Sequence, residues 1–295
     1  MTDLAGAAAA ATAVLTAAGV ASPAVDARWL VAAAAGHDPR RRPAAPLDPA
    51  AAARLDALVA RRAAREPLQL VIGTTAFRTL TLACVPGVFV PRPETEVLAG
   101  LAVTAARAAV AAHGTALVVE PCCGTGAVAL AVAVEVPGAR VVAGDVDPAA
   151  VALARANAAE VRDLRPGAVE AREGDLLEVL APDERGHVDV VVANPPYLPR
   201  ADLPTLPPEV ADHDPHRALF GGPDGHEVVG ALLGAAAAAL TPGGTVLCEI
   251  DARRGDDALA RAAAAGLVDA ELHRDLGGAA RFLGARRPGP QVARG

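Results

Sequence analysis

The stretch that decides the fold is Val118-Val119-Glu120-Pro121-Cys122-Cys123-Gly124-Thr125-Gly126-Ala127. It starts as an apolar strand over 116–119, passes through a glycine-bearing turn at 121–126 and opens an apolar helix over 127–135. Glycines after a strand let the backbone approach a ligand closely, and the helix that follows offers free N–H groups. The stretch therefore predicts a strand–turn–helix unit of an α/β protein, with a ligand at the turn.

Strands and helices are predicted to alternate from Glu96 onward. The predicted helices are 96–112, 127–135, 148–157, 227–240 and 255–265. The predicted strands are 116–119, 140–143, 168–172, 188–193 and 245–250, followed by a final pair of short strands that ends at 283. Repeated strand–helix–strand units build a parallel sheet with helices on both faces. We therefore predict an α/β fold over 93–286, with a doubly wound, mostly parallel, seven-stranded Rossmann-like sheet.

The part of the chain before this sheet has a different pattern. Short amphipathic helices broken at 19–23 and 37–49 predict a small N-terminal helical domain over 1–67. Residues 68–92 are richer in Val and Thr and are punctuated by Gly and Pro, which predicts a hairpin linker. The tail at 287–295 is rich in Arg, Pro and Gly and is expected to be loose.

Composition excludes several classes of protein. The chain has 295 residues, a net charge of −7 and no Lys, so it has no basic footprint for stable nucleic-acid binding. The uncharged run 5–22 lacks the basic start of a signal peptide and the Leu, Ile, Val and Phe content of a spanning helix. We therefore expect a soluble, cytoplasmic protein with no membrane partner.

Cys and His residues do not indicate a metal. Cys84, Cys122, Cys123 and Cys248 are too scattered for a disulfide framework and are expected to be small, reduced hydrophobic residues. The His residues at 187, 213, 216 and 226 do not have ligand spacing, so we assign no metal. Trp29 lies among helical apolar residues and is expected in the core.

The glycine turn indicates a cofactor that contains a nucleoside. Asp145 follows Gly126 by 19 residues, at the end of the next strand, which suits a carboxylate that accepts hydrogen bonds from ribose hydroxyls. The pattern Gly124-x-Gly126-x-x-Ala129 also satisfies the dinucleotide fingerprint. Glu120 would repel a pyrophosphate but attract a cofactor that carries an ammonium and a sulfonium. The turn therefore favours S-adenosylmethionine over a dinucleotide.

A second motif, Asn194-Pro195-Pro196-Tyr197, follows the strand 188–193. It uses one of two Asn and the only Tyr in the chain. Two prolines remove two N–H groups and keep the loop out of a helix, so Asn194 Oδ1 and the Pro195 carbonyl can each accept one N–H from a planar nitrogen. The Tyr197 ring would pack against the same group. An amide or amine nitrogen held beside a sulfonium methyl can be methylated through orientation and exclusion of water.

These motifs carry a resemblance to a known family. Glu120-x-x-x-Gly124-x-Gly126, Asp145, Asp175 and Asn-Pro-Pro-Tyr, in this order, resemble a class I S-adenosylmethionine-dependent methyltransferase. Further segments over about 10–285 are similar to the narrower HemK-like protein-(glutamine-N(5)) methyltransferases. They are Ala18–Arg28, Glu66-Pro67-Leu68, Phe89-Val-Pro-Arg-Pro-Glu-Thr-Glu96, Asp212–Leu219, Gly221–Gly225, and Arg274–Gly278 with Arg281.

The resemblance implies a function and a set of site residues. It implies that the helical domain recognises a protein substrate, and that the side-chain amide of Gln in the Gly-Gly-Gln motif of a class 1 peptide chain release factor is methylated. The implied cofactor-binding residues are Glu120, Cys122, Cys123, Gly124, Thr125, Gly126, Asp145, Asp175, Leu176 and Asn194. The implied catalytic substrate clamp is Asn194, Pro195, Pro196 and Tyr197.

The chain also departs from the family pattern. The family usually has Gly where this chain has Cys122, Asp where it has Glu120, and often an aromatic residue where it has Leu176. Cys122 can serve if its φ is ordinary. Three alternatives stay open: an adenine-N(6) or other nucleic-acid amino methyltransferase, a paralogue that modifies another protein, and a catalytically silent cofactor-binding protein.

Two groups of charged residues have alternative interpretations. Arg92, Glu94 and Glu96 could form a lid over the cofactor or a solvated helix start. Glu249, at a strand end, could be a site acid, although a surface or capping role is the simpler expectation.

Overall fold

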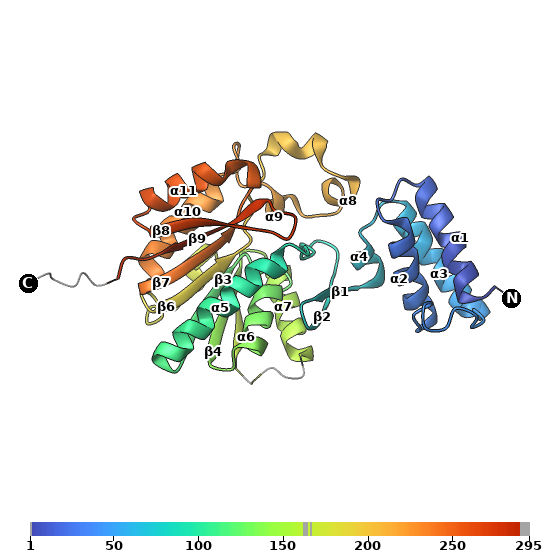
Figure 1. Ribbon diagram of the computed structural model, residues 1–295, viewed down its shortest axis with the longest axis horizontal. Coiled ribbons are helices and arrows are strands. Elements are labelled where there is room, and N and C mark those ends of the chain that lie inside the picture. Colours follow the sequence, from blue (N-terminus) through green and yellow to red (C-terminus); the bar gives the residue numbers. More distant parts are fainter. Residues whose placement is uncertain (1, 162–164, 166, 290–295) are drawn as a thin grey trace, which may run out of the picture. The chain divides into compact units, whose positions relative to one another are not determined.

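The computed structural model describes residues 2–161, 165 and 167–289, and the chain forms two compact units (Figure 1). The first is Met1–Thr74 with Leu206–His213, and the second is Thr75–Thr205 with Asp214–Gly295. The sequence placed 206–213 in the 93–286 domain, whereas the structure groups this segment with the helical unit. Most of the predicted loose tail 287–295 lies outside the described residues.

The first unit is helical. Its elements are α1 (Leu4–Ala17), α2 (Pro23–Ala35), α3 (Pro49–Ala63), α4 (Leu68–Ile72) and α8 (Pro208–Ala211). Asp3 and Asp48 cap α1 and α3 by accepting backbone N–H groups, and Pro occupies the first turn of α2 and α3. The predicted helical domain is therefore present, but 68–72, expected in the hairpin linker, forms α4.

Trp29 is not in the core of this unit. Its neighbours Leu30 and Val31 are fully buried, whereas Trp29 is 53% exposed and Val25, one turn earlier on α2, is 42% exposed. The α2 face that carries Val25 and Trp29 is therefore the solvent face, and the expectation for Trp29 was wrong. An apolar residue type alone does not tell which face of a short helix is buried.

Ion pairs hold α8 within the first unit. The Arg62 guanidinium, which is buried, donates to Asp26 at 2.7 Å and to Glu209 at 2.9 Å. Arg65 donates to both oxygens of Glu209 at 2.8 and 2.7 Å. Burial alone would raise the pKa of Glu209, but hydrogen bonds from Arg65 and Arg62 outweigh it and lower the pKa to about 2.

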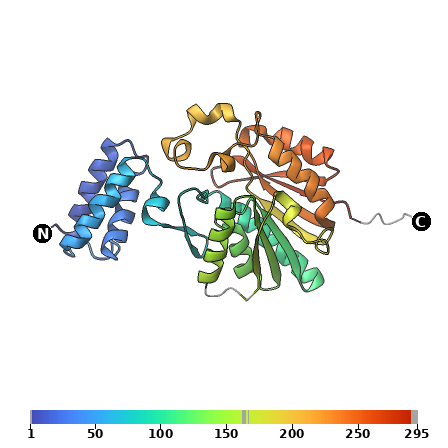
Figure 2. The same cartoon turned by 180° about the vertical axis from the view of Figure 1, so that it is seen from behind.

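The second unit is built on a seven-stranded sheet (Figures 1 and 2). Its strands are β3 (Ala116–Pro121), β4 (Ala139–Asp145), β5 (Val169–Glu173), β6 (Val188–Ala193), β7 (Leu240–Glu249), β8 (Val268–Arg274) and β9 (Ala280–Arg286). The order is β5-β4-β3-β6-β7-β9-β8; β9 runs antiparallel to β7 and β8, whereas the other pairs described in this sheet are parallel. The prediction of a doubly wound, mostly parallel sheet is confirmed. The strand order reverses between β3 and β6, where such sheets bind ligands.

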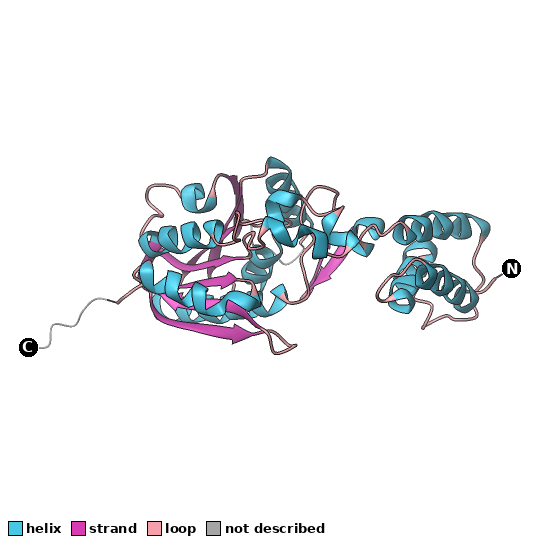
Figure 3. Cartoon of the chain, turned by 90° about the horizontal axis from the view of Figure 1, so that it is seen from above, coloured by secondary structure: helices cyan, strands magenta, loops and turns pink. Residues whose placement is uncertain are grey.

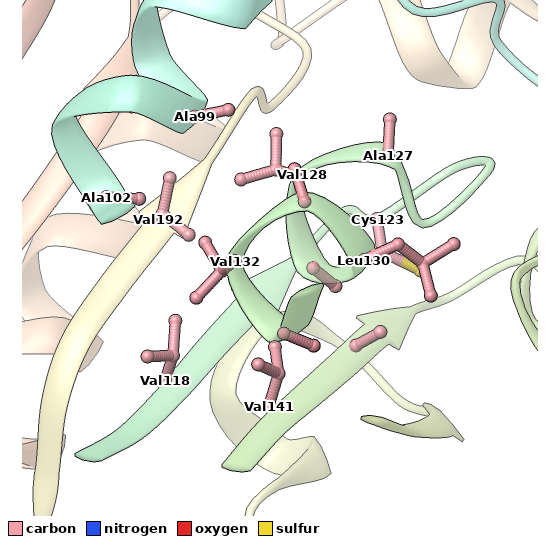
Figure 4. Close-up of a cluster of buried hydrophobic side chains, with 14 of the residues drawn as sticks. Ala99, Ala102, Val118, Cys123, Ala127, Val128, Leu130, Val132, Val141 and Val192 are labelled. Atoms are coloured by element: carbon pink, nitrogen blue, oxygen red, sulfur yellow. The ribbon is translucent and has the colours of Figure 1, made fainter. Parts of the chain in front are cut away.

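Helices cover both faces of this sheet (Figure 3). Alternate strand residues point to opposite faces, so Val118 and Val119 of β3 belong to two different cores. One core includes α5 (Thr95–His113), α6 (Ala127–Glu135) and α7 (Pro148–Glu160), and Figure 4 shows part of it. The other includes α10 (Glu227–Ala239) and α11 (Gly255–Ala264). Burial on both faces explains why the central strands β3 and β6 are almost wholly apolar.

Shorter elements complete the second unit. They are the hairpin strands β1 (Thr74–Phe77) and β2 (Leu80–Ala83), the 3₁₀ turns η1 (Leu176–Val179), η2 (Arg200–Thr205) and η3 (Ala252–Arg254), and α9 (His216–Leu219). Helix α5 is long and apolar enough to cross a membrane by length and composition alone. In this structure its buried face, which includes Leu98 and Val103, packs into the first of the two cores.

Candidate functional site

A cavity of about 220 Å³ lies at the carboxyl ends of β3, β4 and β6, at the switch point of the sheet. Most of the predicted cofactor-binding residues line it: Glu120, Cys122, Cys123, Gly124, Thr125, Asp145, Asp175, Leu176 and Asn194. Of the predicted clamp, Asn194 and Pro196 line it. Gly126, Pro195 and Tyr197 are not among its described lining residues. The structure thus brings together, in one cavity, side chains from four separate stretches of the sequence.

The Asp145 carboxylate organises the glycine turn. One oxygen accepts the Gly124 N–H at 2.9 Å, and the other accepts the Asp147 N–H at 2.9 Å. Burial raises the pKa of Asp145, and these two hydrogen bonds oppose the rise. A carboxylate has about four acceptor positions, so each oxygen keeps one for a ligand.

Cys122 does not have an ordinary φ. Its φ is +62°, in the left-handed region, next to Gly124 at +53° and Gly126 at +78°. The condition under which Cys122 would replace the family's Gly without strain, an ordinary φ, is therefore not met. A side chain there costs about 1–2 kcal/mol. Burial raises the pKa of the Cys122 and Cys123 thiols, which are therefore neutral and weakly nucleophilic at pH 7.

Glu120 is 3% exposed, at the end of β3. Its Oε2 accepts the Ala129 N–H in the first turn of α6 at 2.7 Å, so the carboxyl group also caps this helix. Burial, and to a lesser extent the nearby charge of Asp145, raises the pKa of Glu120 well above its ordinary value. The site therefore favours a cation beside this group, because a cation would restore the ionised form.

Two segments that the sequence did not place in the site wall the cavity. Val88, Phe89 and Pro91 come from the linker before α5, and Arg217 and Phe220 come from the α9 region. Arg92 and the two Glu residues of the α5 start are not among the described lining residues. The Arg92 guanidinium lies 4.7 Å from the Phe89 ring centroid and pairs with Asp214, while Glu96 accepts the Arg78 N–H at 3.0 Å. For these charged residues the structure favours the helix start over a lid.

The clamp motif divides between the cavity and the core. Asn194 lies on the cavity wall, whereas the Tyr197 ring packs against the core that contains α10. The Tyr197 hydroxyl donates to Glu249 Oε1 at 3.0 Å. The structure thus places the Tyr197 ring in the core beside the motif, which differs from the expected contact with a substrate.

Glu249 is 2% exposed, so of the expected surface or capping role the surface position was wrong. Its Oε2 accepts the Thr95 hydroxyl at 2.9 Å, and Thr95 Oγ1 lies 3.4 Å from Asn194 Nδ2. Sequence reasoning did not select Thr95. The available signals were its place in the Phe89–Glu96 motif and the position of Glu249 at a strand end.

Glycines press the backbone of 221–225 against the clamp motif. A Cβ at Gly221 would lie 2.3 Å from the Pro196 carbonyl oxygen, and one at Gly225 would lie 2.4 Å from the Tyr197 carbonyl oxygen. The Leu198 N–H donates to the Leu219 carbonyl at 2.9 Å, and Gly221 N–H donates to the Leu198 carbonyl at 3.1 Å. These contacts explain why the sequence has Gly at both positions.

Metal-ligating side chains do not gather in the site. Within residues 2–161, 165 and 167–289, no group of three or more His, Cys, Asp or Glu residues could hold a metal ion.

Comparison with known proteins identifies the family. The chain is 45% identical over 293 residues to the release factor glutamine methyltransferase of Mycolicibacterium smegmatis, covering 97% of this chain and 99% of that protein. The chain belongs to the release factor glutamine methyltransferase family. The resemblance to HemK-like protein-(glutamine-N(5)) methyltransferases is thus confirmed, and the protein is a methyltransferase.

Other matches agree with this family. The release factor glutamine methyltransferase of Streptomyces coelicolor is 42% identical over 92% of this chain and 94% of its own length. Residues 7–73 match the PrmC N-terminal domain family, and residues 118–213 match a methyltransferase domain family. A methyltransferase structure from Pyrococcus furiosus has a TM-score of 0.50 at 19% identity, covering 72% of this chain and 91% of that one, and it supports the fold.

Proposed function

We propose that this release factor glutamine methyltransferase transfers a methyl group from S-adenosylmethionine to the side-chain amide nitrogen of a protein Gln. The substrate is the Gln of the Gly-Gly-Gln motif of a class 1 peptide chain release factor. One observation carries the proposal. A buried carboxyl group, Glu120, and a partly buried one, Asp145, line the same cavity as Asn194, so a cationic nucleoside cofactor and a polar planar substrate group can meet there.

The cavity has the donor set that S-adenosylmethionine needs. Asp145 would accept hydrogen bonds from the ribose hydroxyls, and Glu120 would attract the ammonium of the amino-acid end. Leu176, Val146 and Phe89 offer apolar surface for the adenine, and 122–126 supply the turn. When bound, this cofactor supplies a methyl group activated on a sulfonium.

Asn194 and Pro195 act on the substrate nitrogen. Asn194 Oδ1 and the Pro195 carbonyl would each accept one N–H of the Gln side chain, which shifts electron density to the nitrogen and fixes its direction. The nitrogen forms a bond to the methyl carbon as the carbon–sulfur bond breaks. The nitrogen then loses a proton, which becomes acidic once the nitrogen is alkylated. Pro196 closes the wall of the cavity and helps to exclude water.

The helical unit supports recognition of a protein substrate. Its α2 helix exposes Val25 and Trp29 one turn apart, and exposed aromatic and aliphatic side chains are common anchors in protein interfaces. A substrate that acts in translation termination also places the enzyme in the cytoplasm.

Transfer of labelled methyl groups tests this function. The purified protein is incubated with labelled S-adenosylmethionine and one of three substrates: a release factor, the same factor with its motif Gln changed to Ala, or duplex DNA. We expect label on the unaltered factor only. Label on DNA, or equal label on both forms of the factor, would refute the proposal. Tight cofactor binding with no label on any substrate would instead support the catalytically silent alternative.

A further inference from the structure

We propose that Thr95 and Glu249 are positioning residues that orient the side-chain amide of Asn194, so that its oxygen faces the substrate. This inference rests on the proposed function for its consequence in catalysis. The orientation itself follows from the contacts among Thr95, Glu249, Tyr197 and Asn194, and it can be tested without activity.

Glu249 has a buried carboxyl group. It sits at the end of β7 and accepts one hydroxyl on each oxygen: Thr95 on Oε2 at 2.9 Å and Tyr197 on Oε1 at 3.0 Å. Burial raises the pKa of Glu249, whereas both hydroxyls and the charge of Arg281 favour the ionised form. The two hydroxyls are the donors in these bonds, and the carboxyl oxygens of Glu249 are the acceptors.

The Thr95 hydroxyl has a single proton to donate. Because this proton goes to Glu249, Oγ1 can only accept a bond from any other neighbour. That neighbour is Nδ2 of Asn194, at 3.4 Å. Asn194 Nδ2 therefore donates to Thr95 Oγ1, and the Thr95 hydroxyl donates to Glu249 Oε2.

The Asn194 side-chain amide has two ends, an NH₂ donor and an oxygen acceptor. Its NH₂ and oxygen are nearly equal in size, so sterics alone hardly distinguish one orientation from the one rotated by 180°. The hydroxyl of Thr95 holds the NH₂ end, which leaves Oδ1 as the end available to the cavity that Asn194 lines. In the rotated form an NH₂ donor would meet the N–H donors of the substrate Gln, and binding of a reactive amide would fail.

Thr95 permits a closely matched test. It is 4% exposed, and Thr95→Val keeps its branched shape while removing the hydroxyl. Thr95→Ser keeps the hydroxyl and loses a methyl group. If the hydroxyl sets the orientation of the Asn194 amide, Thr95→Ser should behave like wild type and Thr95→Val should not. If Thr95 acts only by packing, Thr95→Val should behave like wild type and Thr95→Ser should not.

The amide can be observed directly, because the chain has only two Asn residues. Selective ¹⁵N-asparagine labelling gives two side-chain NH₂ signals in the full-length protein, and Asn194→Ala assigns one of them. Asn157 is an internal control, since its Nδ2 donates to the Thr125 carbonyl at 3.0 Å, away from Thr95. We expect Thr95→Val to speed hydrogen exchange of the Asn194 NH₂ about threefold or more and to leave Asn157 unchanged, while Thr95→Ser resembles wild type.

Kinetics provide the second readout. We expect Thr95→Val to lower kcat about tenfold, with the Kd for S-adenosylmethionine within about threefold of wild type, and Thr95→Ser to keep most of kcat. A release factor with Glu in place of the motif Gln adds a specificity measurement. This carboxylate should inhibit Thr95→Val more strongly than wild type, because a rotated Asn194 amide offers it a donor.

The outcomes separate the two proposals. If wild type does not methylate the release factor, the proposed function fails, and the exchange measurement still decides the orientation. If wild type is active but Thr95→Val leaves both Asn194 exchange and kcat within about twofold of wild type, the positioning role is refuted. A Ser variant as slow as the Val variant would also refute it, since packing would then explain both.

Discussion

Two loops at the carboxyl ends of adjacent strands, β3 and β6, line the same cavity but are held in different ways. The turn 121–126 is fixed mainly through its own backbone N–H groups: the Cys123 N–H donates to the Gly144 carbonyl at 2.8 Å, and the Gly124 N–H donates to the Asp145 carboxylate at 2.9 Å. The clamp 194–197 is fixed by groups far away in sequence, namely Thr95, Glu249 and the glycine segment 221–225.

This difference explains which loop tolerates substitution. A turn held through its backbone can accept an unusual side chain, as it does at Cys122, at a moderate cost in stability. A loop that must present a particular amide oxygen depends on every group that touches it. Changes at the clamp should therefore affect turnover, and changes at the glycine turn should affect cofactor affinity and stability.

The largest effect is expected at the clamp itself. Asn194→Ala removes the oxygen proposed to accept the substrate N–H, so kcat should fall about a hundredfold or more, comparable with loss of a preorganised hydrogen bond in other active sites. Cofactor affinity should stay within about tenfold, or ~1.4 kcal/mol. Turnover and cofactor titration check this, and near-normal turnover would remove the clamp from the mechanism.

Gly221→Ala should have the next largest effect. The new Cβ would lie 2.3 Å from the Pro196 carbonyl oxygen, so the clamp has to move. A displacement of about 1 Å can lower turnover about a hundredfold, and overpacking costs about 1–3 kcal/mol in stability.

Gly234→Ala is the matched control for this change. Gly234 lies in α10, and a Cβ there would have no heavy atom within 4 Å. It should leave turnover unchanged and stabilise the protein by about 0.5–1 kcal/mol. If both variants had the same turnover, close packing of 221–225 would not position the clamp.

Glu120→Gln should weaken cofactor binding by about tenfold and flatten its pH dependence. The pKa of Glu120 is raised, so at low pH the carboxyl group is protonated and must lose a proton to face a cationic cofactor. Wild-type affinity should therefore rise with pH above the ordinary carboxyl pKa of about 4.3, until the raised pKa of free Glu120 is passed. Calorimetric titration at several pH values measures this, and a residual slope from Asp145 is expected in the variant. Identical slopes in both proteins would exclude a charge role for Glu120.

Cys122→Gly should have the smallest effect and should stabilise the protein. Relief of the left-handed strain at φ +62° exceeds the extra chain entropy that Gly loses on folding, for a net gain of about 0.5–1 kcal/mol. Gly124→Ala is the opposite control, because φ is +53° there and a Cβ would make only an ordinary contact at 3.7 Å. Denaturant unfolding should move in opposite directions for the two variants.

Much of the fold could be predicted from local pattern. The helix 127–135 and the strand 188–193 have the predicted bounds, and Asp147 caps α7 ahead of Pro148 as expected. Apolar periodicity, capping residues and Gly or Pro at turns act over a few residues, so the sequence shows them directly. The helix 68–72 was missed because a run of five residues, four of them apolar, is compatible with either a strand or a helical turn.

By itself, the sequence determined the order of the elements and the chemistry of the two loops. Glu120, Asp145 and Asn194 each follow an apolar strand, and parallel strands bring their carboxyl ends to one edge of the sheet. Only the tertiary structure decided which side chains meet there: Thr95 and Glu249 at Asn194, Tyr197 in the core, and Glu209 at Arg62 and Arg65. These contacts join residues far apart in the chain, so they depend on strand order, register and side-chain direction, which no local pattern contains.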